Sequence, residues 1–134
     1  MKTHYTLALA MLVGVAIGAG AIQGLHAQAK PPVYFVGEIT VTDPDRFDKE
    51  FAPKIQATIR EAGGRLVAVG GAGGGGAQAI KEFDGTPPKR VAIQVWDSME
   101  KIQAWRDSVA FKEARKIGEK YATFRSYAVE GRPQ

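Results

Sequence analysis

The first feature that could do chemistry is the glycine run at positions 70–76, which follows a strand-like stretch at 65–69. Residues 71–76 satisfy the spacing G-x-G-x-x-G, which in dinucleotide-binding proteins brings a pyrophosphate to a helix N-terminus. Only seven residues, AQAIKEF, separate Gly76 from the chain-breaking DGTPP. They are too few for a crossover helix, and no Lys-Ser or Lys-Thr pair follows as in a P-loop. We therefore interpret the run as a flexible connection between strands.

The N-terminal segment has the pattern of an export signal. An uncharged run at 6–22 is followed by Ala27-Gln28-Ala29, the small-residue pattern of signal peptidase. We predict a signal peptide at 1–29 and one domain at 30–134 that is periplasmic or secreted, without a stable membrane anchor after cleavage. An uncleaved membrane anchor is the alternative.

The mature chain lacks the residue types that most often bind metals or act as nucleophiles. The chain has no cysteine, and both histidines, His4 and His26, lie in the predicted signal. Disulfides, zinc sites built on Cys or His, histidine-ligated haem and a Ser-His-Asp relay are therefore excluded. Asp43, Asp45 and Asp48 are spaced like ligands of a calcium loop, but Pro44 makes them cap and first-turn residues of a helix. We expect no metal and no cofactor.

The charge balance does not indicate a nucleic-acid partner. Lys2 is the one basic residue of the predicted signal, so 17 basic residues face 14 acidic ones in the mature chain, with both signs interleaved. A mixed, solvated surface is the better interpretation.

Hydrophobic periodicity predicts a βαββαβ order. Strands are expected at 31–41, 65–69, 90–96 and 123–129, with a weaker one at 77–83. A helix begins after the cap Asp43, buries the stripe Phe47, Phe51, Ile55 and Ile59, and ends at Gly63-Gly64. Two further helices follow, one opened by an Asp97–Glu100 capping box and one capped by Ser108. Two β-α-β halves of this kind predict the ferredoxin-like α+β fold, an antiparallel sheet with helices on one face.

Alternation within the strands predicts an apolar second face of the sheet. Val33, Phe35, Gly37, Ile39 and Val41 are expected to face the helices, with Val91, Ile93 and Val95 from the third strand. The helix-free face would then carry Tyr34, Val36, Glu38, Gln94, Trp96, Arg125, Tyr127 and Val129. Left in water, these residues would form a contiguous apolar patch. We therefore predict a homodimer in which a second copy covers the patch.

The same face supplies the candidate site residues. Tyr34, Glu38, Gln94, Trp96, Arg125 and Tyr127 would line an enclosed space with aromatic walls and few polar groups, as small-ligand sites do. Glu38 is the residue there that could act as a general acid or base near neutral pH. The alternative is that Glu38 and Arg125 only form an ion pair, because an enclosed charge requires a partner.

The stretch Tyr34–Gly131 resembles the bacterial family known as domain of unknown function 1330. The resemblance is carried by the opening tyrosine, VTDPDRF at 41–47, AGGR at 62–65, Gly70-Gly71, and Trp105, Ser108 and Phe111. It implies the dimeric α+β barrel superfamily and no particular activity. Distant barrel relatives include cofactor-independent oxygenases, isomerases and haem enzymes, several of which use a histidine that the mature chain lacks.

Three functions remain open. The first is an exported homodimer that binds a small, partly aromatic molecule between its two sheets. The second is an enzyme of the cofactor-independent oxygenase or isomerase type, using Glu38 with Arg125 or Tyr127 as catalytic residues. RNA binding through the sheet face is the third, and it is disfavoured because KRVAIQVW lacks the RNA-recognition signature.

Overall fold

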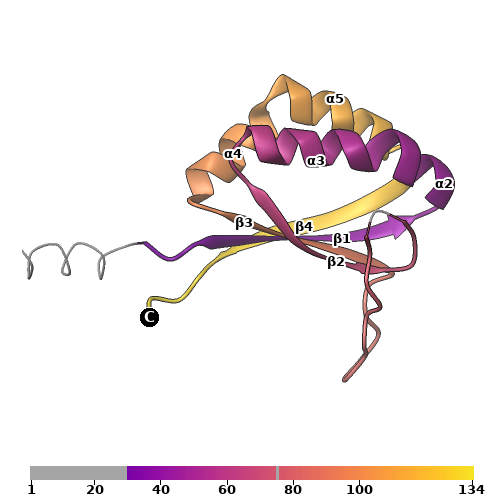
Figure 1. Ribbon diagram of the computed structural model, residues 1–134, viewed down its shortest axis with the longest axis horizontal. Helices are drawn as coiled ribbons and strands as arrows, with labels where there is room; N and C mark the ends of the chain where they lie inside the picture. Colours follow the sequence, from indigo (N-terminus) through magenta and orange to yellow (C-terminus); the bar gives the residue numbers. More distant parts are fainter. Residues whose placement is uncertain (1–29, 75) are drawn as a thin grey trace, which may run out of the picture. The chain divides into compact units, whose positions relative to one another are not determined.

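The computed structural model describes residues 30–74 and 76–134, which form an antiparallel sheet with helices over one face (Figure 1). Along the chain the elements are β1 (Val33–Val41), α2 (Pro44–Arg46), the π-helical turn η1 (Phe47–Phe51), α3 (Ala52–Glu61), β2 (Arg65–Gly71), β3 (Arg90–Trp96), α4 (Met99–Asp107), α5 (Val109–Gly118) and β4 (Ala122–Glu130). The predicted ferredoxin-like fold class is confirmed. The signal peptide expected at 1–29 lies outside the described residues and stays a prediction. In the described part of the chain, no helix is long and apolar enough to cross a membrane.

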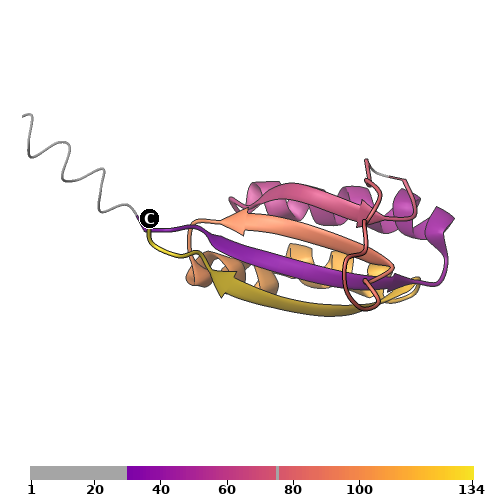
Figure 2. The same cartoon turned by 90° about the horizontal axis from the view of Figure 1, so that it is seen from below.

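The sheet has the strand order β2-β3-β1-β4, with all neighbours antiparallel. As expected for this topology, β1 lies between β3 and β4. The weak strand expected at 77–83 is not one, because only an isolated bridge joins Gly70 to Gln78. The connection between β2 and β3 instead bends onto the helix-free face at one end of the sheet (Figures 1 and 2). A Cβ atom placed on Gly70 would lie 2.9 Å from Ile80 Cγ1, so Ile80 packs directly on this glycine.

The first helical segment begins as its sequence predicts and then widens. The Asp43 Oδ1 atom accepts a hydrogen bond from the Arg46 amide at 3.2 Å, and Pro44 occupies the first turn. At η1 the Ala52 amide bonds to the Phe47 carbonyl, five residues back. This wider turn was not expected. Its physical reason is Pro53, which has no N–H with which to continue the regular i→i−4 ladder.

Of the caps predicted for the last two helices, one is confirmed and one is wrong. Ser108 caps α5 as predicted, its hydroxyl accepting from the Phe111 amide at 3.2 Å. The cap of α4 is Ser98, which accepts from the Lys101 amide, so the predicted capping by Asp97 is wrong. Both residues are good caps in principle. Asp97 instead pairs with Lys101 on the surface.

Two clusters of buried side chains hold the helices to the sheet. One is built around Trp96, Trp105, Phe35 and Phe111, and the other around Phe47, Phe51 and Ile39. Trp96 is 1% exposed, and its ring centroid lies 5.2 Å from that of Trp105. Gly64, directly before β2, lies against the same indole. A Cβ atom there would come within 2.5 Å of Trp96 Cε2.

We predict that Gly64→Ala destabilises the fold by about 1–3 kcal/mol, because a rigid, fully buried indole must shift to admit the methyl group. The control is Gly37→Ala in β1, where the nearest atom to the new Cβ is the Ala92 carbonyl oxygen at 3.9 Å. That substitution should be neutral or raise stability by up to about 1 kcal/mol through a less flexible unfolded chain. Urea unfolding measures both values. Equal stability of the two variants would contradict the packing described for Trp96.

Candidate functional site

The structure divides the predicted site residues between the two faces of the sheet. Gln94 pairs with Phe35, and Trp96 pairs with Val33, so both lie on the helix-covered face. The prediction that they occupy the helix-free face is therefore wrong. In the segment RVAIQVW successive side chains alternate between the two faces of the sheet, and both faces receive apolar residues. Hydrophobicity alone therefore did not select a face. Tertiary packing decided it, because the indole of Trp96 finds its contacts under the helices.

The other predicted residues lie on the helix-free face as expected. Val36 pairs with Tyr127 and Tyr34 with Val129 across β1 and β4. Tyr34 is 42%, Tyr127 45% and Val129 58% exposed. The β3 residues that share this face are Val91, Ile93 and Val95, all half-buried, where Gln94 and Trp96 had been expected.

Glu38 and Arg125 face each other across the same two strands. The Arg125 Nε atom lies 2.9 Å from Glu38 Oε2, while the Arg125 side chain is 77% exposed and that of Glu38 23%. Glu38 Oε2 is buried and makes no hydrogen bond with any described residue, so the contact is an ion pair only. A more open hollow at this end of the sheet includes Glu38, Pro88 and Arg125, and about 270 Å³ of it is open to the centre of a water-sized sphere.

A more enclosed cavity lies on the opposite side, between the sheet and the helices. Its volume is about 80 Å³, measured as the space open to the centre of a water-sized sphere. One water needs only about 10–15 Å³ by this measure, so the cavity has room for part of a small organic molecule. Its aromatic lining consists of Phe35, Phe47, Phe51, Trp105, Phe111 and Phe124.

Small residues in adjacent strands form the floor of this cavity. Gly37 pairs with Ala92 on one side and with Ser126 on the other, and all three line the space. The walls come from both core clusters, Trp105 and Phe111 from one and Phe47 and Phe51 from the other. The sequence contained a signal for this site, since the helix-facing positions of the central strands are small at the point where they meet in register. It could be recognised only once the register was known.

Gln94 gives the cavity a hydrogen-bond donor on a buried side chain. The residue is 5% exposed, and its Oε1 atom accepts from the Trp96 indole at 2.9 Å. Because an indole N–H can only donate, it must meet the amide oxygen, which leaves the amide nitrogen for another partner. The nitrogen is not a buried atom without a partner, since among the described residues Glu38 Oε2 is the buried side-chain atom that lacks one. Gln94 is thus a predicted ligand residue, but on the face opposite to the one expected.

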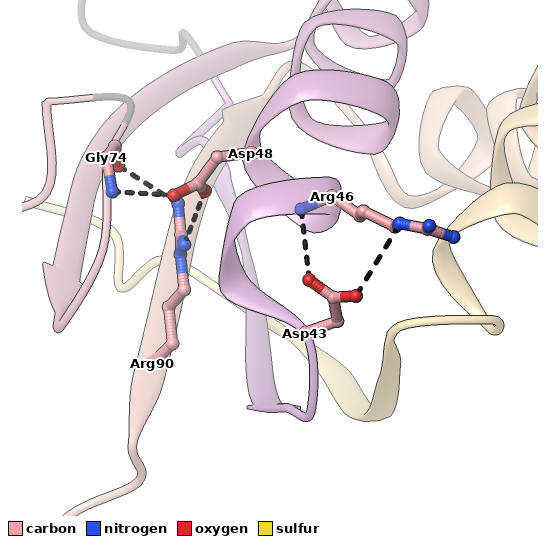
Figure 3. A network of polar contacts seen from close by, with 5 residues as sticks. All are labelled: Asp43, Arg46, Asp48, Gly74 and Arg90. Atoms are coloured by element: carbon pink, nitrogen blue, oxygen red, sulfur yellow. Dashed lines mark hydrogen bonds and ion pairs between the residues drawn. The ribbon is translucent and has the colours of Figure 1, made fainter.

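The glycine run is bound to the wall of the cavity. Arg90, 5% exposed, donates from Nη1 to Asp48 Oδ1 at 2.8 Å and from Nη2 to the Gly74 carbonyl at 3.1 Å (Figure 3). The Gly74 amide donates to Asp48 Oδ2 at 2.7 Å. A Cβ atom on Gly73 would lie 2.6 Å from Arg90 Nη1, and its φ of +127° is one that glycine adopts most readily. The run therefore binds a side-chain ion pair, and its described residues do not open a helix as a phosphate-binding loop would.

Two further arginines, Arg106 of α4 and Arg115 of α5, line the cavity. The guanidinium carbon of Arg106 lies 4.5 Å from the ring centroid of Phe111, and that of Arg115 lies 3.8 Å from the ring centroid of Phe124. Burial lowers the pKa of Arg106, and the neighbouring charge of Arg115 lowers it further. Sequence reasoning did not identify these arginines, because they belong to helices whose cavity-facing sides were expected to be core.

We predict that Asp48→Asn destabilises the fold by about 2–3 kcal/mol, because the amide keeps the size but removes the charge opposite a buried guanidinium. Asp97→Asn is the control, since Asp97 also pairs with a cation at 2.9 Å but is 78% exposed. Its effect should be below about 0.5 kcal/mol. Thermal and urea unfolding give both numbers. If Asp48→Asn lowers stability no more than Asp97→Asn does, the Arg90–Asp48 pair stabilises the fold no more than an exposed ion pair.

The comparisons with known proteins agree with this architecture. The sequence model of the family described as Domain of unknown function (DUF1330) matches residues 32–132. A comparison with curated proteins found no match. Among solved structures, SnoaB, a cofactor-independent oxygenase from Streptomyces nogalater, is 20% identical with a TM-score of 0.55. The alignment covers 78% of this chain and 96% of SnoaB.

Two other solved structures share the fold. A conserved protein of unknown function from Bacteroides thetaiotaomicron, described as a possible oxidoreductase, is 13% identical with a TM-score of 0.52, over 77% of this chain and 100% of that one. HapK from Hahella chejuensis is 17% identical with a TM-score of 0.52, over 76% of this chain and 94% of that one. At these identities the likeness establishes the fold alone.

Proposed function

We propose that this chain, which belongs to the DUF1330 family as its sequence motifs predicted, binds a small, partly aromatic molecule in the cavity between its sheet and its helices. This proposal keeps the kind of ligand expected from the sequence and moves its site. The sequence favoured the space between two paired sheets, whereas the cavity lies on the other face.

The observation that carries the proposal is the unfilled cavity itself, about 80 Å³ between the sheet and the helices. Protein interiors are normally close-packed, and unfilled space among ordered side chains reduces stability, so such a space is unusual unless another molecule occupies it. Here aromatic rings form most of the walls, and the side chain of Gln94, 5% exposed, is one of the few polar groups in the lining. Apolar walls with a few polar groups in fixed positions are what a small-ligand site requires.

The chain supplies its own reporter for binding. Its two tryptophans are Trp96 and Trp105, and Trp105 lines the cavity while Trp96 donates to Gln94. Screening aromatic acids and quinone-like compounds should find some that raise the melting temperature and change tryptophan fluorescence. The absence of any such compound across a broad library would refute the proposal.

Ala92→Leu should weaken the binding of any such compound by at least about tenfold. The larger side chain would occupy the cavity floor, so part of the compound would remain in water. Each methylene of the compound that is not buried costs about 0.8 kcal/mol of binding free energy. Ala110→Leu is the matched control, since Ala110 is exposed on α5 and is not part of the cavity lining. It should leave affinity unchanged. Full affinity in Ala92→Leu would place the compound elsewhere.

Catalysis of the kind named for SnoaB is the second candidate. The shared fold and the enclosed cavity support it, and neither identifies a reaction. The catalytic residues expected from the sequence, Glu38, Arg125 and Tyr127, lie on the helix-free face, and none of the described residues that line the helix-side cavity is a carboxylate. A general base of the expected kind is thus missing from the lining of the site that best fits a ligand, so we place binding first.

We also propose that the protein is a homodimer paired through its helix-free face. Tyr34, Tyr127 and Val129 are 42–58% exposed there, around half-buried Val36, Ile93 and Val95. A contiguous apolar surface of this kind marks an interaction site, and a twofold contact would cover it on both copies at once.

Val129→Glu should shift the protein toward monomers, because it places a charge within this apolar surface. The matched control is Val109→Glu, whose valine is 71% exposed on α5, on the helix side of the molecule. Light scattering at micromolar concentration measures the mass, and circular dichroism checks that both variants fold. A monomeric unmodified protein would overturn the dimer, and an unaffected Val129→Glu dimer would place the interface elsewhere.

A further inference from the structure

We infer that the cavity ligand is an aromatic anion, a ring carrying a carboxylate, whose negative charge lies against Arg106 and Arg115. This inference rests on the proposed function, because it assigns a chemical class to the molecule bound in the same cavity. It follows from the charges that line the cavity, which the binding proposal did not use.

The lining of the cavity is positive. Among the described residues it includes three arginines, Arg90, Arg106 and Arg115, and no aspartate or glutamate. Arg90 is neutralised at once by Asp48, at 2.8 Å. Arg115 contacts Glu119 at 3.2 Å, but that carboxylate is 60% exposed, so solvent weakens its effect. Arg106 makes no ion pair with any described residue, although Asp107 follows it directly in the chain.

Two guanidinium groups in one lining favour an anion between them. Each group repels the other, and burial further disfavours the charge on Arg106, as the lowered pKa of this arginine reflects. A carboxylate bound there would replace repulsion with attraction and would accept charge-assisted hydrogen bonds. A cation would add to the repulsion, and a neutral group would leave it unchanged.

The aromatic rings hold both guanidinium groups in place before a ligand arrives. Phe111 lies under Arg106 and Phe124 under Arg115, at centroid distances of 4.5 and 3.8 Å. A guanidinium that lies over a ring can keep its in-plane N–H donors available to bind oxygen, and Arg115 already donates from Nε to Glu119 Oε1 at 3.2 Å. Because the side chains are already ordered, less entropy is lost when they bind an anion.

A neutral polar group in the lining sets the rest of the ligand. Gln94, 5% exposed, offers an N–H donor among aromatic walls, so it would meet a second oxygen on the ring system. An aromatic carboxylate with a second oxygen substituent fulfils both requirements. Hydroxybenzoates are the simplest members of this class.

The test compares 4-hydroxybenzoate with its neutral isostere 4-hydroxybenzamide, with tryptophan fluorescence and calorimetry as readouts. The carboxylate should bind at least about tenfold more tightly, the ratio expected for one charge-assisted contact. Arg106→Gln should remove most of that preference and leave the weaker affinity for the amide within about twofold, because it deletes one charge from the lining. Arg60→Gln is the control, since Arg60 is exposed on α3 and makes no ion pair with any described residue.

The outcomes separate the inference from the proposal beneath it. Equal affinity for the acid and the amide in the unmodified protein would overturn the inference that the ligand is an anion and would leave the proposal of ligand binding intact. Full preference for the acid in Arg106→Gln, as in the Arg60→Gln control, would also overturn it. If Arg106→Gln does not fold, the comparison of acid with amide in the unmodified protein still decides. Binding of neither compound, with no other aromatic molecule bound in the library screen, would instead refute the proposed function.

Discussion

The sheet carries apolar side chains on both of its faces, whereas the helices in the described part of the chain cover one of them. On the covered face Phe35 and Trp96 bury their rings together with Trp105 of α4, and this contact holds the helix to the sheet. On the other face Val36 and Ile93 pair across the central strands, and the connection between β2 and β3 crosses one end of the sheet (Figure 2). Because burial of apolar surface is the main favourable term in folding, the second face leaves part of that free energy unused within one chain.

The covered face is also not packed uniformly. Gly37, Ala92 and Ser126 meet in register and hold few atoms, while large rings stand on either side of them. Protein interiors are normally close-packed, and unfilled space lined by well-ordered side chains reduces stability. A cavity of this kind, whose lining also includes the polar side chain of Gln94, is better explained as a binding site than as a defect of the core.

The glycine run is connected to the cavity through Arg90. Its backbone follows Arg90 and Asp48 so closely that a side chain at Gly73 or Gly74 would contact one of them. The spacing that imitates a nucleotide-binding motif therefore reflects a close approach between backbone and side chains. Arg90 is held by this segment on one side and lines the cavity on the other, so the loop contributes to the shape of the site without touching its interior.

Local sequence determined most of the elements of this protein and their order along the chain. The cap at Asp43, the stripe from Phe47 to Ile59 and the stop at Gly63 are short-range signals, and each depends only on residues within a few turns. Pro53 shows the limit of such signals, because its missing N–H widened a turn that the hydrophobic stripe alone did not reveal.

The positions of the site residues were decided by tertiary structure. Strand β3 is apolar on both sides, so only the packing of Trp96 under the helices determined that Gln94 lies inward and Ile93 outward. The cavity depends on the register of three strands that are distant in sequence, and its positive lining on two helices meeting above them. Pairing between distant segments is not encoded at any single position, which is why the sequence alone did not determine the side of the sheet on which Gln94 and Trp96 lie.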